Sequence, residues 1–391
     1  MRSRHDPRFR HMVKQARHTV MVLGSGVIGG QVADLLSRMD NRYHIILASR
    51  TLNKVNERAN LTITSAMCLG LEPKVDIYCL DVQNIDQTAS LISSLSPDLI
   101  INATSLQPFW AISLLEKPLF QRLQQARIGP WLPNHLATAR TVMLAVAASG
   151  SQASVINAAF PDVVNPALHS VGLAPLVGAG NIANLIPSLQ RACEKIMGAP
   201  RDRLSLRFAA HHAACNEISS TGRPDPAPYA LSLMLDGREA SSDIQHSALF
   251  KSVVDDFRRV RGIAGQIVAA SNVVAVAVAL LDERNTRAMH APGPHGLPGG
   301  YPVRIGKGGV SLDCIGGFGS DEAISVNEAG AVVEGIEAIL PDGTIIFTDQ
   351  EMTVLKNEFG YYCKKMHVNE ASLHAEELQS RYQSYIKKSP R

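Results

Sequence analysis

A glycine-rich turn near the N-terminus is the feature that most constrains the fold. The turn is Gly24-Ser25-Gly26-Val27-Ile28-Gly29, and it follows an apolar run at residues 19–23 and precedes apolar residues at helical spacing over 27–38. These patterns predict a strand, a tight turn and a helix. Such a turn is typical of dinucleotide binding, because the glycines let the backbone approach a pyrophosphate at the helix N-terminus. The alternative is a glycine turn that holds no ligand.

Apolar runs and helical patterns then alternate along the first half of the chain. This alternation predicts a parallel sheet with right-handed crossovers, whose ligand crevice lies beyond the carboxyl ends of the strands. Further strands are expected at residues 44–48, 75–80, 98–103, 154–159 and 174–177, and helices at 85–95, 135–148 and 163–171.

The end of the second predicted strand distinguishes between the two nicotinamide dinucleotides. Domains that prefer NAD place a carboxylate there, on the ribose 2′-hydroxyl. This chain has Ser49, Arg50 and Thr51 instead. An arginine can pair with a 2′-phosphate and hydroxyls can donate to it, so the segment favours NADP over NAD. The alternative for Arg50 is a solvated side chain at a strand end.

Two more strand ends carry residues suited to the cofactor. Asp81 and Val82 follow the third strand, where a carboxylate can accept from the adenine amino group and an apolar side chain can pack on the ring. Asp81 is alternatively a cap for the next helix. Asn102, Ala103 and Thr104 follow the fourth strand, where small residues leave room for the ribose and nicotinamide.

With these motifs the first 180 or so residues resemble the saccharopine dehydrogenase-like family of NAD(P)-binding reductases. The resemblance is carried by the glycine turn with Gly30 and by segments 48–51, 80–82, 97–103 and 155–161. It implies NADP-linked oxidation or reduction of C–N bonds in amino acids and polyamines, often through an imine. It carries no catalytic residue over to this chain, because no motif of the second half matches.

The second half of the chain has a different pattern of predicted elements, and this pattern indicates an α+β domain. Strands are expected at residues 204–210 and 230–235, helices at 244–259 and 262–281, and hairpins at 303–313 and 336–348. The fold class predicted is therefore α/β, with an N-terminal Rossmann domain built on a doubly wound parallel sheet plus a second α+β domain. The divisions expected are a flexible basic extension (1–18), the NADP-binding domain (19–198), a substrate or dimerisation domain (199–350) and a C-terminal helical segment (351–391).

A reductase needs a proton donor near the hydride-accepting carbon and a group that holds the substrate. His211 and His212 follow a predicted strand, and Arg223 lies in the loop beyond them. We predict one histidine as the acid and Arg223 as a carboxylate clamp. Tyr301, in a loop rich in glycine and proline, is a second candidate. The alternatives are surface histidines and a structural loop.

Polar residues after the fifth and sixth predicted strands belong to the same end of the crevice. Asp162 and Asn181 are expected near the nicotinamide by their position in the sequence. Each is alternatively the cap of the helix that follows it.

Composition excludes several classes of partner. Lys and Arg total 38 against 35 Asp and Glu, a balance that gives no field suited to nucleic acid or an anionic membrane. The six cysteines have no metal-binding spacing and no disulfide framework, which favours a reducing cytoplasm and no metal. The apolar residues 262–281 are interrupted by polar ones and predict a buried helix. A small-molecule substrate and a homodimer are expected.

Two hypotheses of function follow. The first is an NADPH-dependent oxidoreductase that acts on an imine, an amino acid or a 2-oxo acid in a cleft between the domains. The second is a dinucleotide-binding sensor or scaffold without turnover, which the lack of an unambiguous catalytic pair in the sequence leaves open.

Overall fold

A computed structural model describes residues 18–39, 42–314 and 316–388. The basic extension predicted for residues 1–18 lies outside the described residues apart from His18, which begins the first strand.

The first half of the chain forms the predicted parallel sheet. The strand order is β3-β2-β1-β4-β5-β6, and every adjacent pair is parallel. The strands are buried on both faces at the sheet centre, as their continuous apolar sequences require. This confirms the Rossmann part of the fold class. The strands are β1 (His18–Leu23), β2 (Tyr43–Ser49), β3 (Lys74–Cys79), β4 (Leu99–Asn102), β5 (Ser154–Asn157) and β6 (Val177–Gly178).

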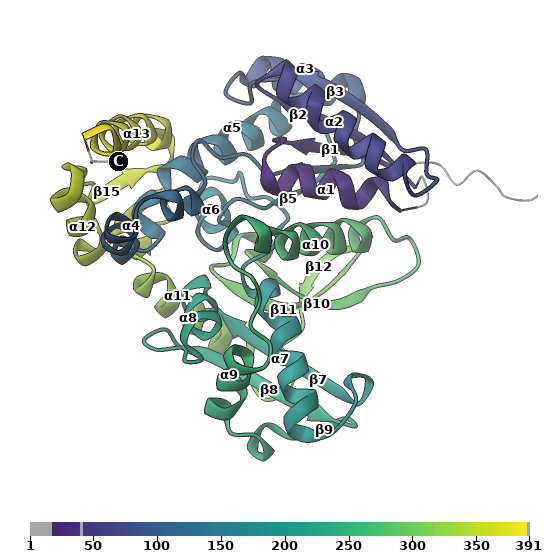
Figure 1. Cartoon of the computed structure of the whole chain (residues 1–391), viewed down its shortest axis with the longest axis vertical. Coiled ribbons are helices and arrows are strands. Elements are labelled where there is room, and N and C mark those ends of the chain that lie inside the picture. The colour runs from purple at the N-terminus through teal and green to yellow at the C-terminus, as the bar shows by residue number, and fades with distance from the viewer. Residues whose placement is uncertain (1–17, 40–41, 315, 389–391) are drawn as a thin grey trace, which may run out of the picture.

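Helices cover both faces of this sheet. On one face α3 and α5 pack over the strands, and on the other α1 lies between the sheet and α10 of the second half (Figure 1). The helices of the first half are α1 (Val27–Ser37), α2 (Leu52–Met67), α3 (Ile85–Leu95), α4 (Lys117–Leu123), α5 (Pro133–Ser149) and α6 (Pro161–His169).

A second sheet follows, and it is antiparallel. Its order is β10-β11-β7-β8-β9, with β12 paired to β11. The predicted hairpin at residues 303–313 is confirmed, since Val303 pairs with Leu312 across the turn. The strands are β7 (Leu204–Ala210), β8 (Tyr229–Leu235), β9 (Arg238–Glu239), β10 (Arg287–Pro292), β11 (Gly300–Gly306) and β12 (Gly309–Leu312). The helices are α7 (Ile182–Met197), α8 (His212–Thr221), α9 (His246–Asp255), α10 (Gly262–Leu280) and α11 (Ser320–Val333).

Helix α10 is the most apolar helix of the structure. By length and composition alone it could cross a membrane, but half of its most apolar window is buried inside the molecule. It packs against α1, α7 and β11. These contacts are those of a core helix that joins the two sheets.

A smaller third sheet closes the chain. It consists of β13 (Ile336–Ile339), β14 (Thr344–Phe347) and β15 (Lys365–His367), and the predicted pairing of its first hairpin is confirmed. Helices α12 (Asp349–Phe359) and α13 (Ala371–Lys388) pack with it against α4 and α5 of the first half (Figure 1). One hydrophobic core therefore joins residues of the Rossmann half to residues on both sides of position 350, and the expected divisions at 198 and 350 stay predictions.

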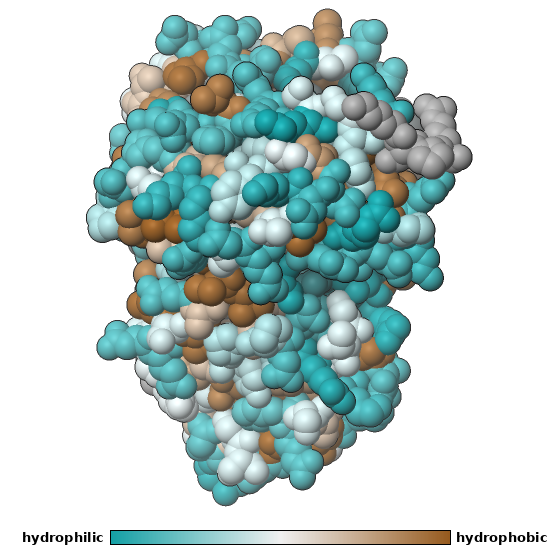
Figure 2. Space-filling view, turned by 90° about the vertical axis from the view of Figure 1, so that its left-hand side faces the viewer, coloured by the Kyte–Doolittle hydropathy of each residue, from teal (hydrophilic) through white to brown (hydrophobic). Residues whose placement is uncertain are grey.

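Short 3-10 helices complete the described residues. They are Phe109–Leu114, Gln124–Ala126, Gly129–Trp131, Arg201–Arg203, Ser241–Asp243, Pro294–Gly296 and Val368–Glu370. On the face shown in Figure 2, hydrophobic residues form small groups among hydrophilic ones.

Candidate active site

A cavity of about 420 Å³ lies at the carboxyl ends of the parallel strands, where a Rossmann sheet binds its ligand. It extends from the glycine turn to the first residue of α8 in the second half of the chain. Among the predicted site residues, those that line it are Gly24, Ser25, Gly26, Val27, Ile28, Ser49, Arg50, Asp81, Val82, Ala103, Thr104 and His212.

The glycine turn has the shape that a pyrophosphate needs. A Cβ on Gly29 would lie 1.9 Å from the carbonyl oxygen of Gly24, so only glycine lets α1 pack this closely on the turn. A Cβ on Gly26 would meet nothing within 4 Å, and Gly26 lines the cavity. No side chain caps α1 and no acidic residue lies in its first turn. Its N-terminal amides are thus free to bind an anion.

The end of the cavity beside β2 and β3 is suited to the adenosine part of the cofactor. Arg50 is exposed there, and no carboxylate of the described residues pairs with its guanidinium. Asp81 accepts the backbone N–H of Gln83 at 3.1 Å, and the buried Val82 presents an apolar surface. Thr51 lies outside the cavity lining and begins α2 as its N-cap. The turn and Arg50 together fit NADP.

Asn102 lies behind the cavity wall, in a row of buried amides. It donates to Asn157 at 3.2 Å and accepts from the hydroxyl of Thr104 at 2.6 Å. Asn157 donates in turn to Asn165 at 2.9 Å. Asn102 therefore holds Thr104, which lines the cavity, and fixes the loop after β4.

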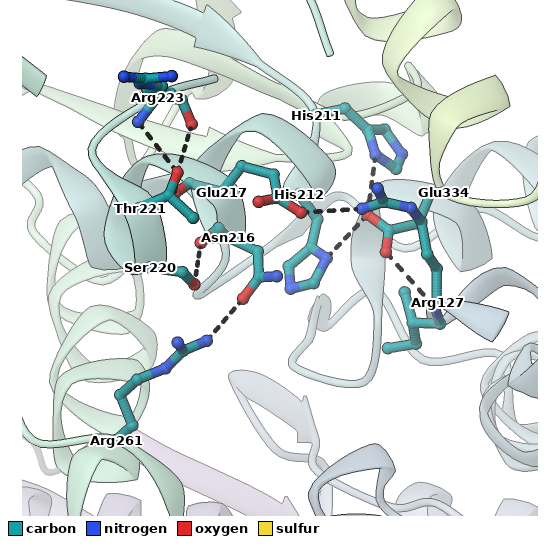
Figure 3. A network of polar contacts seen from close by, with 11 residues as sticks. Arg127, His211, His212, Asn216, Glu217, Ser220, Thr221, Arg223, Arg261 and Glu334 are labelled. Atoms are coloured by element: carbon teal, nitrogen blue, oxygen red, sulfur yellow. Dashed lines mark hydrogen bonds and ion pairs between the residues drawn. The ribbon is translucent and has the colours of Figure 1, made fainter. Parts of the chain in front are cut away.

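At the other end of the cavity, His212 is paired with a buried carboxylate. Its Nδ1 lies 3.0 Å from Oε2 of Glu334, a residue only 4% exposed that follows α11 (Figure 3). Burial lowers the pKa of His212, but the charge and hydrogen bond of Glu334 raise it more, and the net pKa lies above its ordinary value. Glu334 stays ionised, because its pKa is held well below its usual range by His212 and His211 despite burial. The contact with Glu334 thus favours the protonated form of the imidazole that lines the cavity.

Asp162 holds the backbone of His212 from the opposite side. Its Oδ1 accepts the N–H of His212 at 3.0 Å, and its Oδ2 accepts from the side chain of Asn181. Asp162 is fully buried at the start of α6, and Asn181 lines the cavity. The carboxylate of Asp162 thus lies at the N-terminus of α8, where a negative charge is favourable, and it fixes the position of His212.

A second histidine, His135 of α5, lines the same cavity. It is 6% exposed, and neither ring nitrogen has a hydrogen-bond partner among the described residues. Burial lowers its pKa to about 4, so it is neutral near pH 7. The ring of Phe160 contacts both His135 and His212 edge-on, and Phe160 has a left-handed backbone with φ of 48°. Strain of this kind is found where a functional site fixes a side chain.

Three predicted catalytic residues lie elsewhere. His211 is wholly buried 3.7 Å from Glu334, and its Cβ faces Gly330 rather than the cavity. Arg223 is exposed and its backbone N–H bonds to Thr221, so it cannot serve as the expected clamp in this cavity. Tyr301 is 0% exposed within β11, and burial raises its pKa far above the usual range. We therefore remove all three from the candidate set, and of the four only His212 remains.

The residues missed from the sequence are those that the fold brings in from a distance. Glu334 is 122 positions from His212, and no local pattern marks it. His135 lies in a helix with no motif around it, and Phe160 lies within the segment 155–161 but was not singled out. Within the described residues no group of three or more His, Cys, Asp and Glu side chains could hold a metal ion.

The parallel sheet, the glycine turn and the cavity define a dinucleotide-binding protein of the Rossmann class. Residues 20–107 match the family model of the saccharopine dehydrogenase NADP binding domain. This match agrees with the resemblance seen in the sequence, and it supports an NADP-binding segment of the kind found in an oxidoreductase family. The match covers less than a quarter of the chain. A search of curated proteins found no match to the chain.

Solved structures resemble most of the chain at low sequence identity. A lactate dehydrogenase from Eimeria maxima, solved with NADH and oxamate, has 14% identity and a TM-score of 0.52 over 81% of this chain and 91% of its own. A lactate dehydrogenase from a Medee basin deep-sea metagenome library has 11% identity and a TM-score of 0.53, over 81% and 96%. The malate dehydrogenase of Plasmodium falciparum has 12% identity and a TM-score of 0.51, over 92% and 99%. At these identities the likeness shows the fold alone.

Proposed function

We propose that this protein is an NADPH-dependent oxidoreductase that reduces a C=N bond of an imine, or a C=O bond, in the cavity between the two sheets. The observation that carries the proposal is that one cavity joins the glycine turn to the Glu334-paired imidazole of His212. The family of the first domain supports NADP and C–N chemistry.

His212 is the proposed acid. Glu334 occupies Nδ1, so Nε2 is the ring atom available to a substrate, and no described residue bonds to it. The raised pKa favours the protonated form of His212, which can donate to the substrate nitrogen or oxygen. When bound, the nicotinamide supplies the hydride. The apolar side chains of Phe109, Trp110 and Phe160 line the same cavity.

The phosphate assignment is tested with the variant Arg50→Glu. We expect its affinity for NADPH to fall by about tenfold to a hundredfold, because a charged hydrogen bond is lost and a repulsion is gained. Quenching of intrinsic fluorescence by NADPH measures the affinity. Binding of NADH is the internal control, since it lacks the 2′-phosphate and should change little. Equal losses for both dinucleotides would refute the assignment.

A sensor or scaffold that binds the cofactor without turnover remains the competing hypothesis. Sustained NADPH consumption with imines or 2-oxo acids excludes it. The homodimer and the cytoplasmic location predicted from the sequence are likewise proposals, and light scattering of the purified protein tests the first of them.

A further inference from the structure

Two buried carboxylates flank His212, and they give the substrate end of the cavity its electrostatic character. Asp162 is 0% exposed and accepts the His212 backbone N–H, while Glu334 is 4% exposed and contacts the His212 ring. With His212 protonated, these three groups carry a net charge of −1. A substrate that reaches His212, whose side chain is 25% exposed, lies close to this charge.

The surroundings offer little positive charge to balance it. Arg50 lies at the adenosine end, and at the substrate end no Lys or Arg appears among the described residues that line the cavity. Arg127 is engaged by Glu217 at 3.1 Å (Figure 3). Arg259, half-buried on the loop before α10, is close enough to lower the pKa of His212 but does not line the cavity. The cavity lining also includes the apolar side chains of Phe109, Trp110, Ile128 and Phe160 and the uncharged polar side chains of Thr138, Asn181 and Gln266.

We propose that the substrate is an imine whose reacting carbon bears no carboxylate, and that it is held as a cationic iminium against His212, whose backbone and ring contact the buried carboxylates of Asp162 and Glu334. The proposal rests on the proposed function and narrows its substrate class. It also sets this site apart from one built for 2-oxo acids or their imines, which needs a guanidinium or ammonium at the reacting end.

The charge balance explains this preference. Nε2 of His212 gives its proton to the imine nitrogen, whose lone pair forms the new N–H bond while the electrons of the Nε2–H bond stay on the ring. The positive charge passes to the substrate, and the net charge of the cluster with the substrate is the same before and after. An iminium beside two carboxylates is stabilised by their attraction. A substrate carboxylate would instead add a third negative charge with no Lys or Arg in the lining at this end to balance it, which is costly.

A matched pair of cyclic imines tests the proposal. 2-Methyl-1-pyrroline and 1-pyrroline-2-carboxylate share a ring and differ at the reacting carbon, which bears a methyl group in one and a carboxylate in the other. We expect NADPH consumption with a kcat/KM at least about tenfold higher for the methyl compound. The corresponding amines, 2-methylpyrrolidine and proline, give a second readout by calorimetry in the presence of NADP, and 2-methylpyrrolidine should bind more tightly.

Variants that remove a charge test whether the preference between the two imines comes from electrostatics or from the shape of the cavity. Asp162→Asn should narrow the difference between the two imines, because one of the buried negative charges is gone. Glu337→Gln is the matched control, since Glu337 is an exposed acid three positions from Glu334 that pairs with Lys364, and it should leave the difference unchanged. Circular dichroism checks that each variant folds. If Asp162→Asn does not fold, the comparison of the two imines on the unmodified protein decides alone.

The outcomes distinguish this proposal from the function on which it rests. The protein could prefer 1-pyrroline-2-carboxylate, and Arg259→Gln could abolish this preference. That result would overturn the proposal and place substrate recognition on the loop before α10, with the oxidoreductase function intact. Binding of NADPH with neither imine reduced and neither amine bound would also overturn the proposal. Failure to bind NADPH at all would overturn the proposed function itself.

Discussion

His135 and His212 line one cavity, and their pKa values are shifted in opposite directions because their surroundings differ. Burial is the cause of the pKa shift of His135, and it lowers the pKa to about 4. His212 is partly buried, but the carboxylate of Glu334 outweighs the effect of burial and raises its pKa. One imidazole is therefore a neutral hydrogen-bonding group and the other a proton donor. A single carboxylate makes the difference.

Removal of that carboxylate should move the pH dependence of the reaction. With Glu334 present, kcat/KM for reduction should stay high until the pH rises through the raised pKa of His212, and then fall. In Glu334→Gln the burial of His212 is no longer opposed by a charge, so the decline should begin at lower pH. Steady-state rates of NADPH consumption with 2-methyl-1-pyrroline across pH 5 to 9 provide the measurement. Superimposable profiles for the two proteins would remove His212 as the acid.

The same pair contributes to stability with a defined sign. A histidine whose folded pKa is raised stabilises the fold fully below its unfolded pKa of about 6.5, and this contribution is lost as pH rises through the folded pKa. The His212 contribution to the free energy of unfolding should accordingly decrease toward alkaline pH. Urea denaturation of the parent protein and of Glu334→Gln should show this decrease in the parent alone, while Glu337→Gln should behave like the parent.

At the level of elements, two glycines of the N-terminal strand–turn–helix have different roles. One is needed for folding and the other for binding of the cofactor. Gly29→Ala should destabilise the protein, because its Cβ would clash with the carbonyl of Gly24 and force α1 away from β1. Gly26→Ala should fold normally, since nothing lies within 4 Å of its Cβ, but should bind NADPH at least about tenfold more weakly because the methyl group enters the space of the pyrophosphate. Thermal unfolding and NADPH quenching on both variants test this, and normal affinity in Gly26→Ala would contradict the assignment of the turn.

The elements that sequence patterns predict are those with strong local signals. The predicted helix 85–95 is α3 residue for residue, and the strand 204–210 is β7. Helix α2 was not predicted, because its buried stripe consists of Val55, Ala59, Thr62 and Ala66, and these small or polar residues give a weak hydrophobic periodicity. The strand expected at 174–177 is reduced to the two residues of β6, where the chain turns quickly into α7.

The residues of the candidate site likewise fall into those that the sequence predicts and those that it does not. The cofactor residues follow strand ends in order along the chain, so the alternation of strands and helices is sufficient to bring them together. His212 also follows a strand and could be proposed from the sequence. Its partner Glu334 could not, because their contact depends on how α11 packs on α8, and long-range packing leaves no local pattern in the sequence.

In the whole molecule, Glu334 lies where the segment before α5, the start of α8 and the C-terminal sheet meet. Its side chain contacts His212 of the second half and accepts the N–H of Ile128 at 3.4 Å, and its carbonyl accepts the N–H of Gly129 at 2.9 Å. Ile128 and Gly129 belong to the segment that leads into α5, and Glu334 itself leads into β13. The position of the carboxylate is thus set by the packing of the C-terminal sheet on the Rossmann half.

The aromatic cluster around Trp131 should accordingly influence both stability and the site. Trp131 is 1% exposed and contacts Tyr382 of α13 and Phe359 of α12, with ring centroids 5.3 and 6.0 Å apart. Trp131→Ala should lower the free energy of unfolding by about 3–5 kcal/mol, the usual cost of a buried aromatic residue. Because Trp131 follows Ile128 and Gly129, the loosened contact should also free Glu334 and lower the pKa of His212. Chemical denaturation measures the first effect and the pH profile measures the second.

The control is Leu373→Ala, a change at an exposed residue of α13 itself, which should alter neither the stability nor the pH profile. A destabilised Trp131→Ala protein with an unchanged pH profile would show that Glu334 is held by the second half alone.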